Sequence, residues 1–295
     1  SGYLNVRFCT NQILRPYLLL ESVTRPCEYR WMPAPTSTAR TIRCAAFAAT
    51  LSAVWLVGCD GKPKTWRLDG SSMGTTYSVQ TVGHLRDSSR LTTEIETELE
   101  LIEALFSTYL PESEVSRFNA SQSTQWISVS QVVCQLVERS LSFSVRSLGA
   151  FDITVAPLVN AWGFGPDFDV EGIPPTAEVQ RLLGKVGHHR LQTNCDAPAI
   201  RKSTSDLTLD LSAVAKGYAV DAIAATLDRH HVEGYLVEIG GEIRARGENG
   251  DDAPWAVAIE HPLDSAAAPP IIVHLQDGAV ATSGDYRNFI DVDGK

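Results

Sequence analysis

The 295 residues are 44% hydrophobic and 20% charged, the composition of a globular protein with enough chain for one large domain or two small ones. The formal net charge is −10, which argues against nucleic acid, and against a membrane surface held by charge, as partners. The six cysteines form no C-x-x-C pair and no H-E-x-x-H run occurs, so the spacings typical of zinc sites are absent from the sequence.

The first methionine, Met32, is followed by the layout of a secretion signal. Arg40 and Arg43 form a positive stretch, and residues 45–57 form an apolar run of 13 residues. Such a run is too short for a transmembrane helix but has the length of a secretory signal core. It ends in L-V-G-C at Cys59, which resembles a bacterial lipoprotein signal. A buried apolar segment with an incidental cysteine is the alternative.

This layout predicts three parts of the chain. We expect residues 1–31 to be untranslated upstream sequence or disordered, 32–58 to be the signal, and 59–295 to be the mature domain, lipid-anchored through Cys59 on the periplasmic face of the inner membrane. The mature domain then carries 19 basic and 33 acidic residues. Its other two cysteines, Cys134 and Cys195, either pair in an oxidising compartment or stay as buried thiols.

The first part of the mature domain predicts a hairpin and a helix. Residues 62–83 contain two strand-like runs around a polar turn at 69–76, where small residues would let the backbone approach a ligand closely, or would merely form a glycine bulge. Residues 87–109 carry apolar side chains at helical spacing, and we expect the acidic side chains of this helix to form a solvated face. A turn-rich link follows, with Pro111 expected to end the helix.

The middle of the chain predicts two further helices. Residues 130–148 form an amphipathic pattern, with Gly149 expected at the C′ position. The glycine- and aromatic-rich stretch 149–165 follows, whose aromatic side chains would either stack on a planar ligand or belong to the core. Residues 176–186 predict a short helix capped by Thr176.

From residue 189 onward the pattern predicts mostly short strands. They are expected at 190–193, 198–202, 206–211, 235–239, 242–246, 255–260, 271–275 and 279–282. One helix, 213–227, follows directly on the strand expected at 206–211, with Ser212 as its N-cap. Blocks of strands and helices that do not alternate strictly favour an α+β fold with mainly antiparallel sheets and packed helices.

Opposite charges converge where this helix begins. Asp210 lies at the end of the expected strand, and Lys216 lies one turn into the helix. Free backbone N–H groups at the start of a helix can bind an anion. An ordinary junction with an exposed lysine would have the same sequence, so the rest of the chain must decide between the two interpretations.

Six stretches together resemble the FAD:protein FMN transferases, a flavin-transferase family formerly known as thiamine-biosynthesis lipoproteins. Each stretch is short, but all six occur in the family's order over most of residues 65–295. They are 73–75 (M-G-T), 109–119, 149–165, 210–221 (with A-V-A-K), 239–244 (I-G-G-E-I-R) and 279–287. The lipoprotein-like signal is similar to that of many members.

The resemblance implies a magnesium-dependent reaction in a central flavin-nucleotide cleft. The pyrophosphate of FAD is cut, FMN passes to a Thr or Ser hydroxyl of a partner protein, and AMP leaves. Phosphoryl transfer of this kind rests on positioning and on neutralising developing charge. By resemblance, Asp210 and Lys216 are the catalytic residues. The residues implied to bind the nucleotide are Met73, Tyr109, Ala150, Phe151, Asp152, Asp210, Ser212, Lys216 and Thr282.

The resemblance also implies the metal site and the partner. Magnesium prefers hard oxygen ligands in an octahedron. We assign the family's backbone ligand to the carbonyl of Ala213 rather than Ala215, because the first turn of a helix more easily leaves helical geometry. The family's other ligands belong to an S-H-x-x-D-P-x-T-G segment expected beyond Lys295, so residues 1–295 alone are expected to bind magnesium poorly and to have little activity. The expected acceptor is a flavoprotein with a D-G-x-T-like motif, such as a subunit of a membrane electron-transfer complex.

Four other functions stay open on the sequence. The same nucleotide-binding residues would be needed in a periplasmic protein that only binds FAD, or in a pyrophosphatase that cuts FAD to FMN and AMP without transfer. Residues 69–75 read D-G-S-S-M-G-T, which is similar to the pattern D-G-x-[ST]-x-[AG]-[TS] of proteins that accept FMN. On this alternative the chain itself is the acceptor of FMN. A purely structural envelope lipoprotein is the last alternative, which six ordered matches disfavour.

Overall fold

An antiparallel sheet of five strands organises the described part of this computed structural model, residues 64–166, 173–259 and 270–284. The strand order is β1-β2-β6-β7-β10. The strands are β1 (Thr65–Ser72), β2 (Thr75–Val82), β6 (Gly234–Ile239), β7 (Glu242–Arg246) and β10 (Gly278–Ala281). Because β2 pairs with β6, Tyr77 lies opposite Ile239, and the two halves of the chain meet in the middle of the sheet.

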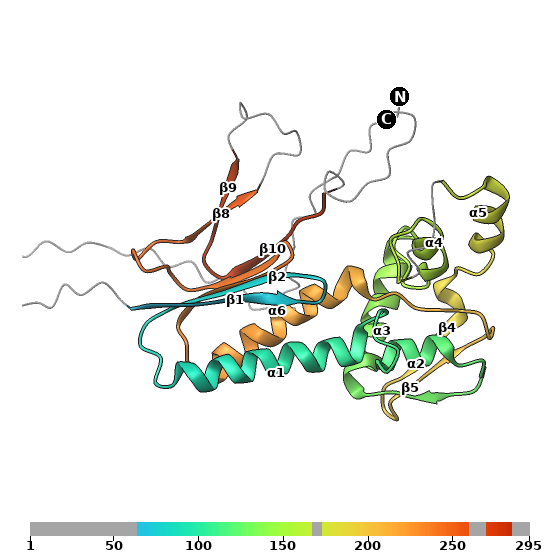
Figure 1. Ribbon diagram of the computed structural model, residues 1–295, viewed down its shortest axis with the longest axis horizontal. Coiled ribbons are helices and arrows are strands. Elements are labelled where there is room, and N and C mark those ends of the chain that lie inside the picture. Colours follow the sequence, from blue (N-terminus) through green and yellow to red (C-terminus); the bar gives the residue numbers. More distant parts are fainter. Residues whose placement is uncertain (1–63, 167–172, 260–269, 285–295) are drawn as a thin grey trace, which may run out of the picture. The chain divides into compact units, whose positions relative to one another are not determined.

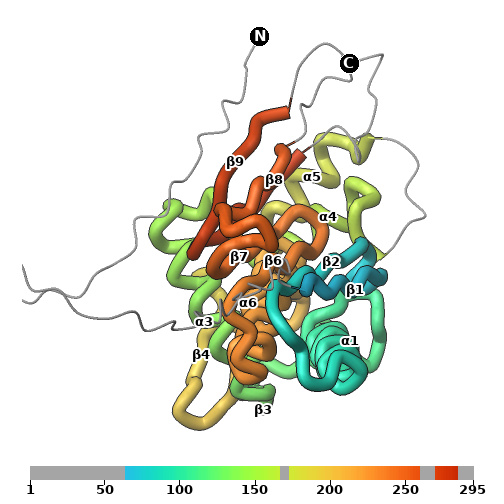
Figure 2. Tube along the Cα trace, turned by 90° about the vertical axis from the view of Figure 1, so that its left-hand side faces the viewer, coloured from blue at the N-terminus to red at the C-terminus, as the bar shows by residue number. Residues whose placement is uncertain are grey.

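Two long helices cover one face of this sheet (Figure 1). They are α1 (Ser88–Phe106) and α6 (Ser212–Arg229), which also pack against each other (Figure 2). Their buried side chains recur at helical spacing, as in Leu91, Ile95 and Leu99 of α1. Each such side chain contributes roughly 1.5–3 kcal/mol by leaving water, so this interface is the main core of the domain.

A second, smaller core involves the hairpin of β8 (Trp255–Ile259) and β9 (Ile271–Leu275). Trp255 and Val257 of this hairpin pack with Leu236 and Ala245 of the large sheet. The Trp255 indole N–H donates to the backbone oxygen of Arg246 at 3.2 Å, which satisfies its one polar atom. The hairpin therefore joins the large sheet through side chains and one hydrogen bond.

The remaining elements form a region around a three-stranded sheet of order β3-β5-β4. Its strands are β3 (Ile127–Ser128), β4 (Leu191–Asn194) and β5 (Ala199–Lys202). Its helices are α2 (Glu114–Ala120), α3 (Gln131–Arg146), α4 (Ala156–Ala161), α5 (Thr176–Leu183) and the 3₁₀ turn η1 (His188–Arg190). A disulfide between Cys134 of α3 and Cys195, just after β4, ties a helix to this sheet and decides between the two states left open for these cysteines.

The α+β prediction is confirmed, and every strand pair among the described residues is antiparallel. The predicted strand at 206–211 is wrong. Residues 207–211 belong to no strand, because a side chain takes the place of the partner strand. The Asn119 amide donates to the backbone oxygen of Leu209 at 2.8 Å, and its oxygen accepts the Leu209 N–H at 2.7 Å.

Several predicted boundaries are also corrected. Ser212 is the first residue of α6 rather than its N-cap, which is Leu211. The helix expected at 87–109 ends at Phe106, and the link after it contains the short helix α2. After α3, Leu148 takes the positive φ expected of a C′ glycine (+54°), with Gly149 following it. Within the described ranges, every helix is too short or too polar to cross a membrane.

Candidate functional site

Three chain segments meet at one end of the large sheet. The β1–β2 turn consists of Met73 and Gly74, with φ of +54° and +71°, and the β6–β7 turn consists of Gly240 and Gly241. A Cβ on Gly240 would lie 2.8 Å from the Thr75 side chain, so only glycine permits this approach. The third segment begins with Thr282, whose N–H and hydroxyl both donate to the Gly241 oxygen at 3.1 Å.

Lys216 of α6 reaches this sheet end and carries its positive charge there. Its Nζ lies 3.2 Å from Oε1 of Glu242, at the start of β7, and its Cδ lies 3.1 Å from where a Cβ on Gly240 would stand. The side chains of Lys216 and Glu242 are 29% and 17% exposed. Burial raises the pKa of Glu242, and the Lys216 ammonium opposes that change. An ion pair this enclosed holds the lysine in one place.

Glu242 is a site residue that the sequence did not single out. Its second carboxylate oxygen is buried and has no hydrogen-bond partner among the described residues. The only sequence signal is its place directly after Gly240 and Gly241, in the run I-G-G-E-I-R. Such a run predicts a turn, and nothing in it indicates that the Glu242 carboxylate contacts a lysine of α6.

Glu103 of α1 accepts hydrogen bonds from the Met73 turn and from the end of β1. Oε1 of Glu103 accepts the Ser72 hydroxyl at 3.0 Å and also accepts the Met73 backbone N–H. A left-handed conformation costs a non-glycine residue about 1–2 kcal/mol, so a hydrogen bond to a charged acceptor at Met73 offsets a real cost. Residues 71–76 and Glu103 line an open depression of about 630 Å³.

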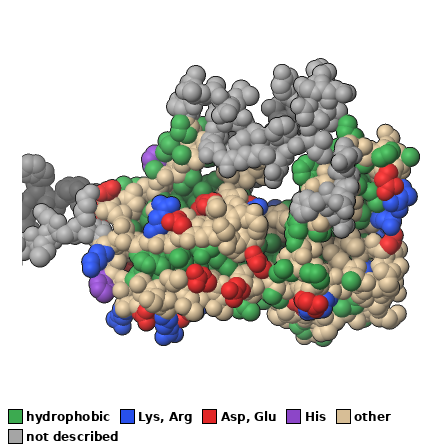
Figure 3. Space-filling model, in the orientation of Figure 1, with side chains coloured by type: hydrophobic (Ala, Val, Ile, Leu, Met, Phe, Trp, Pro, Cys, Tyr) green, Lys and Arg blue, Asp and Glu red, His purple; other side chains and the backbone are tan. Residues whose placement is uncertain are grey.

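The expectation that the acidic residues of α1 are merely solvated is therefore wrong for two of them. Besides Glu103, Glu94 accepts from Arg90 at 2.8 Å and lies 2.7 Å from Nε2 of His230, at the end of α6. Other acidic side chains of α1, such as Glu96 and Glu100, are exposed to solvent as expected. Figure 3 shows acidic side chains in red along the lower front face. Periodicity separates the buried face from the rest but does not tell which exposed acids meet a partner.

Asp210 and the start of α6 form the next part of the site. The Asp210 carboxylate accepts the Ser212 N–H at 2.8 Å. One of the backbone donors at the helix start that we expected to be free is therefore already hydrogen-bonded. Its own N–H donates to the Ile153 oxygen at 2.8 Å, which links this corner to the 150–154 loop. Ser212 and Ala213 are exposed, so the first turn of α6 is open to a ligand.

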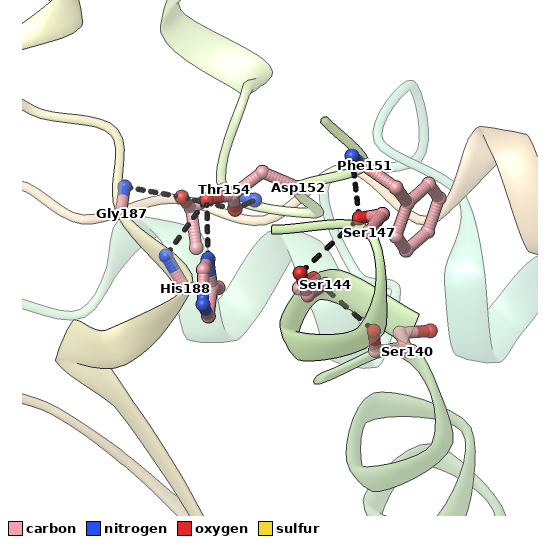
Figure 4. A network of polar contacts seen from close by, with 8 residues as sticks. All are labelled: Ser140, Ser144, Ser147, Phe151, Asp152, Thr154, Gly187 and His188. Carbon is pink, nitrogen blue, oxygen red and sulfur yellow. Dashed lines mark hydrogen bonds and ion pairs between the residues drawn. The ribbon is translucent and has the colours of Figure 1, made fainter. Parts of the chain in front are cut away.

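The 150–154 loop carries three of the expected flavin contacts, and a network of polar contacts fixes its shape (Figure 4). The Asp152 carboxylate accepts the N–H and hydroxyl of Thr154 at 2.8 and 2.6 Å and the His188 N–H at 2.8 Å. Nδ1 of His188 also lies 3.2 Å from it. Burial would raise the pKa of Asp152, but these hydrogen bonds outweigh it and lower the pKa. The Asp152 carboxylate thus organises the loop from within.

The other two expected contacts in this loop are placed at its surface. The Ser147 hydroxyl accepts the Phe151 N–H at 3.0 Å and fixes the backbone where the aromatic side chain begins (Figure 4). The Phe151 ring is half-buried and meets Phe143 edge-on, with centroids 6.5 Å apart. Ala150 beside it is exposed. A flat ring could therefore reach this loop from solvent.

Tyr109 lies in another part of the site and contacts the backbone of Phe164. Its hydroxyl donates to the backbone oxygen of Phe164 at 3.3 Å, and the two side chains are 52% and 47% exposed. Large exposed aromatic side chains are suited to stack on a planar ligand. The contacts of the structure thus bring Met73, Lys216 and Thr282 together, join Asp210 to the 150–152 loop, and leave Tyr109 with Phe164.

The donor set for a metal is incomplete among the described residues. Nowhere in the described ranges do three or more His, Cys, Asp or Glu side chains gather closely enough to hold an ion. The Ala213 carbonyl, on an exposed first helical turn, is one hard oxygen of the kind magnesium prefers. It fits as one ligand and needs others from outside the described residues.

Comparison with known proteins gives consistent matches. A family model described as the ApbE family matches residues 73–295. The FAD:protein FMN transferase of Vibrio cholerae is 38% identical over 250 residues, covering 83% of this chain and 74% of that protein. The one from Escherichia coli K12 is 36% identical over 259 residues, covering 84% and 74%. The solved flavin transferase ApbE from Vibrio cholerae superposes with a TM-score of 0.73 at 37% identity, over 79% of this chain and 75% of that one.

Proposed function

Because the chain belongs to the ApbE family and is a flavin-transfer enzyme that uses FAD, we propose that it moves FMN from FAD to a Thr or Ser hydroxyl of an acceptor flavoprotein and releases AMP. The hydroxyl oxygen bonds to the phosphorus on the FMN side, the bond from that phosphorus to the AMP oxygen breaks, and the hydroxyl proton is lost. No electrons are gained or lost. The acceptor carries a D-G-x-T-like motif and belongs to a membrane electron-transfer complex or a similar flavoprotein.

The observation that carries this proposal is the fixed position of Lys216 at the sheet end, beside the Met73 turn and the start of α6. A lysine held by a half-buried carboxylate, next to exposed helix-start backbone, is suited to bind a pyrophosphate. Asp210 shapes this corner by accepting the Ser212 N–H at the start of α6. Met73, Phe151 and Tyr109, on three segments, offer apolar surface for the flavin and adenine rings. Positioning and charge neutralisation of this kind are what phosphoryl transfer requires.

Magnesium dependence is part of the proposal. The Ala213 carbonyl would supply one ligand, and substrate phosphates, water and chain outside the described residues would supply the others. The ion would neutralise charge on the pyrophosphate as its bond breaks. Lys216 would bind the same group and orient it toward the incoming hydroxyl.

The test is mass spectrometry of an acceptor domain after incubation with FAD, Mg²⁺ and the full-length protein that contains these 295 residues and the remaining metal ligands, with AMP measured by chromatography. We expect the acceptor to gain one FMN in step with AMP release, and an acceptor with Ala at the motif Thr to gain none. AMP without a modified acceptor would identify a pyrophosphatase, and FAD binding without AMP would identify a binding protein. FMN on residues 69–75 of this chain would instead identify it as an acceptor. The first two results contradict the transferase mechanism, and the third contradicts the assignment of the acceptor to a separate flavoprotein.

We also propose that Cys59 is lipidated and anchors the protein on the periplasmic face of the inner membrane. Residues 1–63, including Cys59, lie outside the described residues. The Cys134–Cys195 disulfide supports an oxidising location, where such bonds persist. A Cys59→Ser variant of the full chain, expressed in bacteria, should leave the membrane fraction and lose the acyl mass that the wild type carries. Equal membrane association of both proteins would contradict lipid anchoring.

A further inference from the structure

The Met73–Gly74 turn of the proposed flavin site has an unfavourable backbone conformation at Met73. Both residues have positive φ, which is the geometry of a two-residue turn that normally carries Asn, Asp or Gly at its first position. Methionine has no polar side-chain atom that would favour this conformation locally. Something else must hold the turn in place if Met73 is to present its side chain to a nucleotide.

The contacts around the turn identify what holds it. A single oxygen of Glu103 accepts both the Met73 N–H and the Ser72 hydroxyl at 3.0 Å, so the carboxylate bonds the strand end and the first turn residue at once. Glu103 is part of α1, whose neighbouring side chains Leu99, Ile102 and Phe106 are buried in the main core. The Glu103 carboxylate is therefore held by a well-packed helix, α1. It lines the same depression as residues 71–76.

We propose that Glu103 is a positioning residue of the flavin site, which acts by fixing the Met73 turn and does not touch the reacting atoms. This role rests on the proposed function. Ser72 stands in a G-x-S-x-G run, but that run lies between two strands of a hairpin and not between a strand and a helix. The Ser72–Glu103 contact is thus part of the support of the turn, and Ser72 is no nucleophile elbow.

The experiment compares FAD affinity of the full chain, measured by quenching of flavin fluorescence, for the wild type and three variants. Glu103→Ala should weaken FAD binding by about 10-fold, because the turn loses a charge-assisted hydrogen bond. Glu103→Gln keeps an accepting oxygen and should restore affinity to within about threefold. Glu100→Ala removes the same charge from an exposed position of the same helix and should leave affinity unchanged.

Hydrogen exchange of the Met73 amide, measured without ligand, separates positioning from general loss of structure. Exchange at Met73 should speed up by at least about 10-fold in Glu103→Ala but not in Glu103→Gln, while core amides of β2 stay protected. If Glu103→Ala speeds exchange at Met73 but leaves FAD affinity unchanged, the proposed role of Glu103 is overturned and the proposed function is not. Equal affinity loss in Glu103→Gln and Glu103→Ala would also overturn the role of Glu103. Failure of the wild type to bind FAD would overturn the proposed function, and this role with it.

Discussion

Replacing Lys216 with Ala is expected to weaken FAD binding by about 10- to 100-fold, because a hydrogen bond between charged groups contributes about 1.5–3 kcal/mol. The ammonium is held 3.2 Å from Glu242, so it is pre-positioned and little side-chain freedom is lost when a pyrophosphate binds. The same change leaves the half-buried Glu242 carboxylate without its cation, which should also lower stability. Binding and stability must therefore be measured separately.

Calorimetric titration with FAD and with riboflavin makes that separation. Riboflavin has no phosphate, so its affinity should be the same for the wild type and Lys216→Ala, whereas FAD affinity should fall. Lys185→Ala is the matched control, because Lys185 forms an ion pair with Asp206 at 3.3 Å and is not among the expected site residues. Lys216→Ala/Glu242→Gln removes the unpaired charge and should recover stability but not FAD affinity. An equal loss for riboflavin and FAD would mean that Lys216 acts on the fold and does not bind phosphate.

The second large effect is expected at the disulfide. Replacing Cys134 and Cys195 together with Ser should lower the free energy of unfolding by about 2–4 kcal/mol, near the upper end of that range for so long a loop, because the unfolded chain regains the freedom of the closed loop. The two cysteines are 61 residues apart in sequence. Urea unfolding followed by circular dichroism measures the difference.

The same measurement with reductant is the internal control. Reductant should move the unfolding midpoint of the wild type toward that of the double variant and leave the variant unchanged. A wild-type midpoint that does not respond to reductant, in a protein whose thiols all react with a blocking reagent, would show that the bond does not form. The double variant would then report only the replacement of one buried and one partly buried cysteine side chain.

The fold could be predicted largely from local patterns. Period-two runs and glycine turns locate β6, β7 and β10 to within one residue, because those signals are local. The polar turn predicted at 69–76 is too long, since β1 continues to Ser72 and β2 begins at Thr75. The segment 207–211 was misread, since its alternation of apolar residues is that of a strand but the Asn119 side chain is its partner. Nothing near residue 209 in the sequence contains that information.

The site could be predicted only through resemblance, and its supporting residues not at all. Glu103 and Glu242 are acidic residues in ordinary settings, an amphipathic helix and the start of a strand. Their roles come from packing that brings α1 under the β1–β2 turn and α6 beside β7. Asp152 illustrates the converse, since resemblance points to a ligand contact while its carboxylate is taken up by Thr154 and His188.

The pairing of β2 with β6 has a consequence for how the protein is made. During synthesis the β1–β2 hairpin is complete long before Gly234 and the rest of β6 leave the ribosome, and chain growth at roughly 5–20 residues per second makes that a wait of several seconds or more. Until then the inner edge of β2 is unpaired, a state in which strands associate with the wrong partners. The sheet end that we propose as the nucleotide site is thus completed only when the second half of the sheet arrives, so a nascent chain would gain the ability to hold FAD late in synthesis.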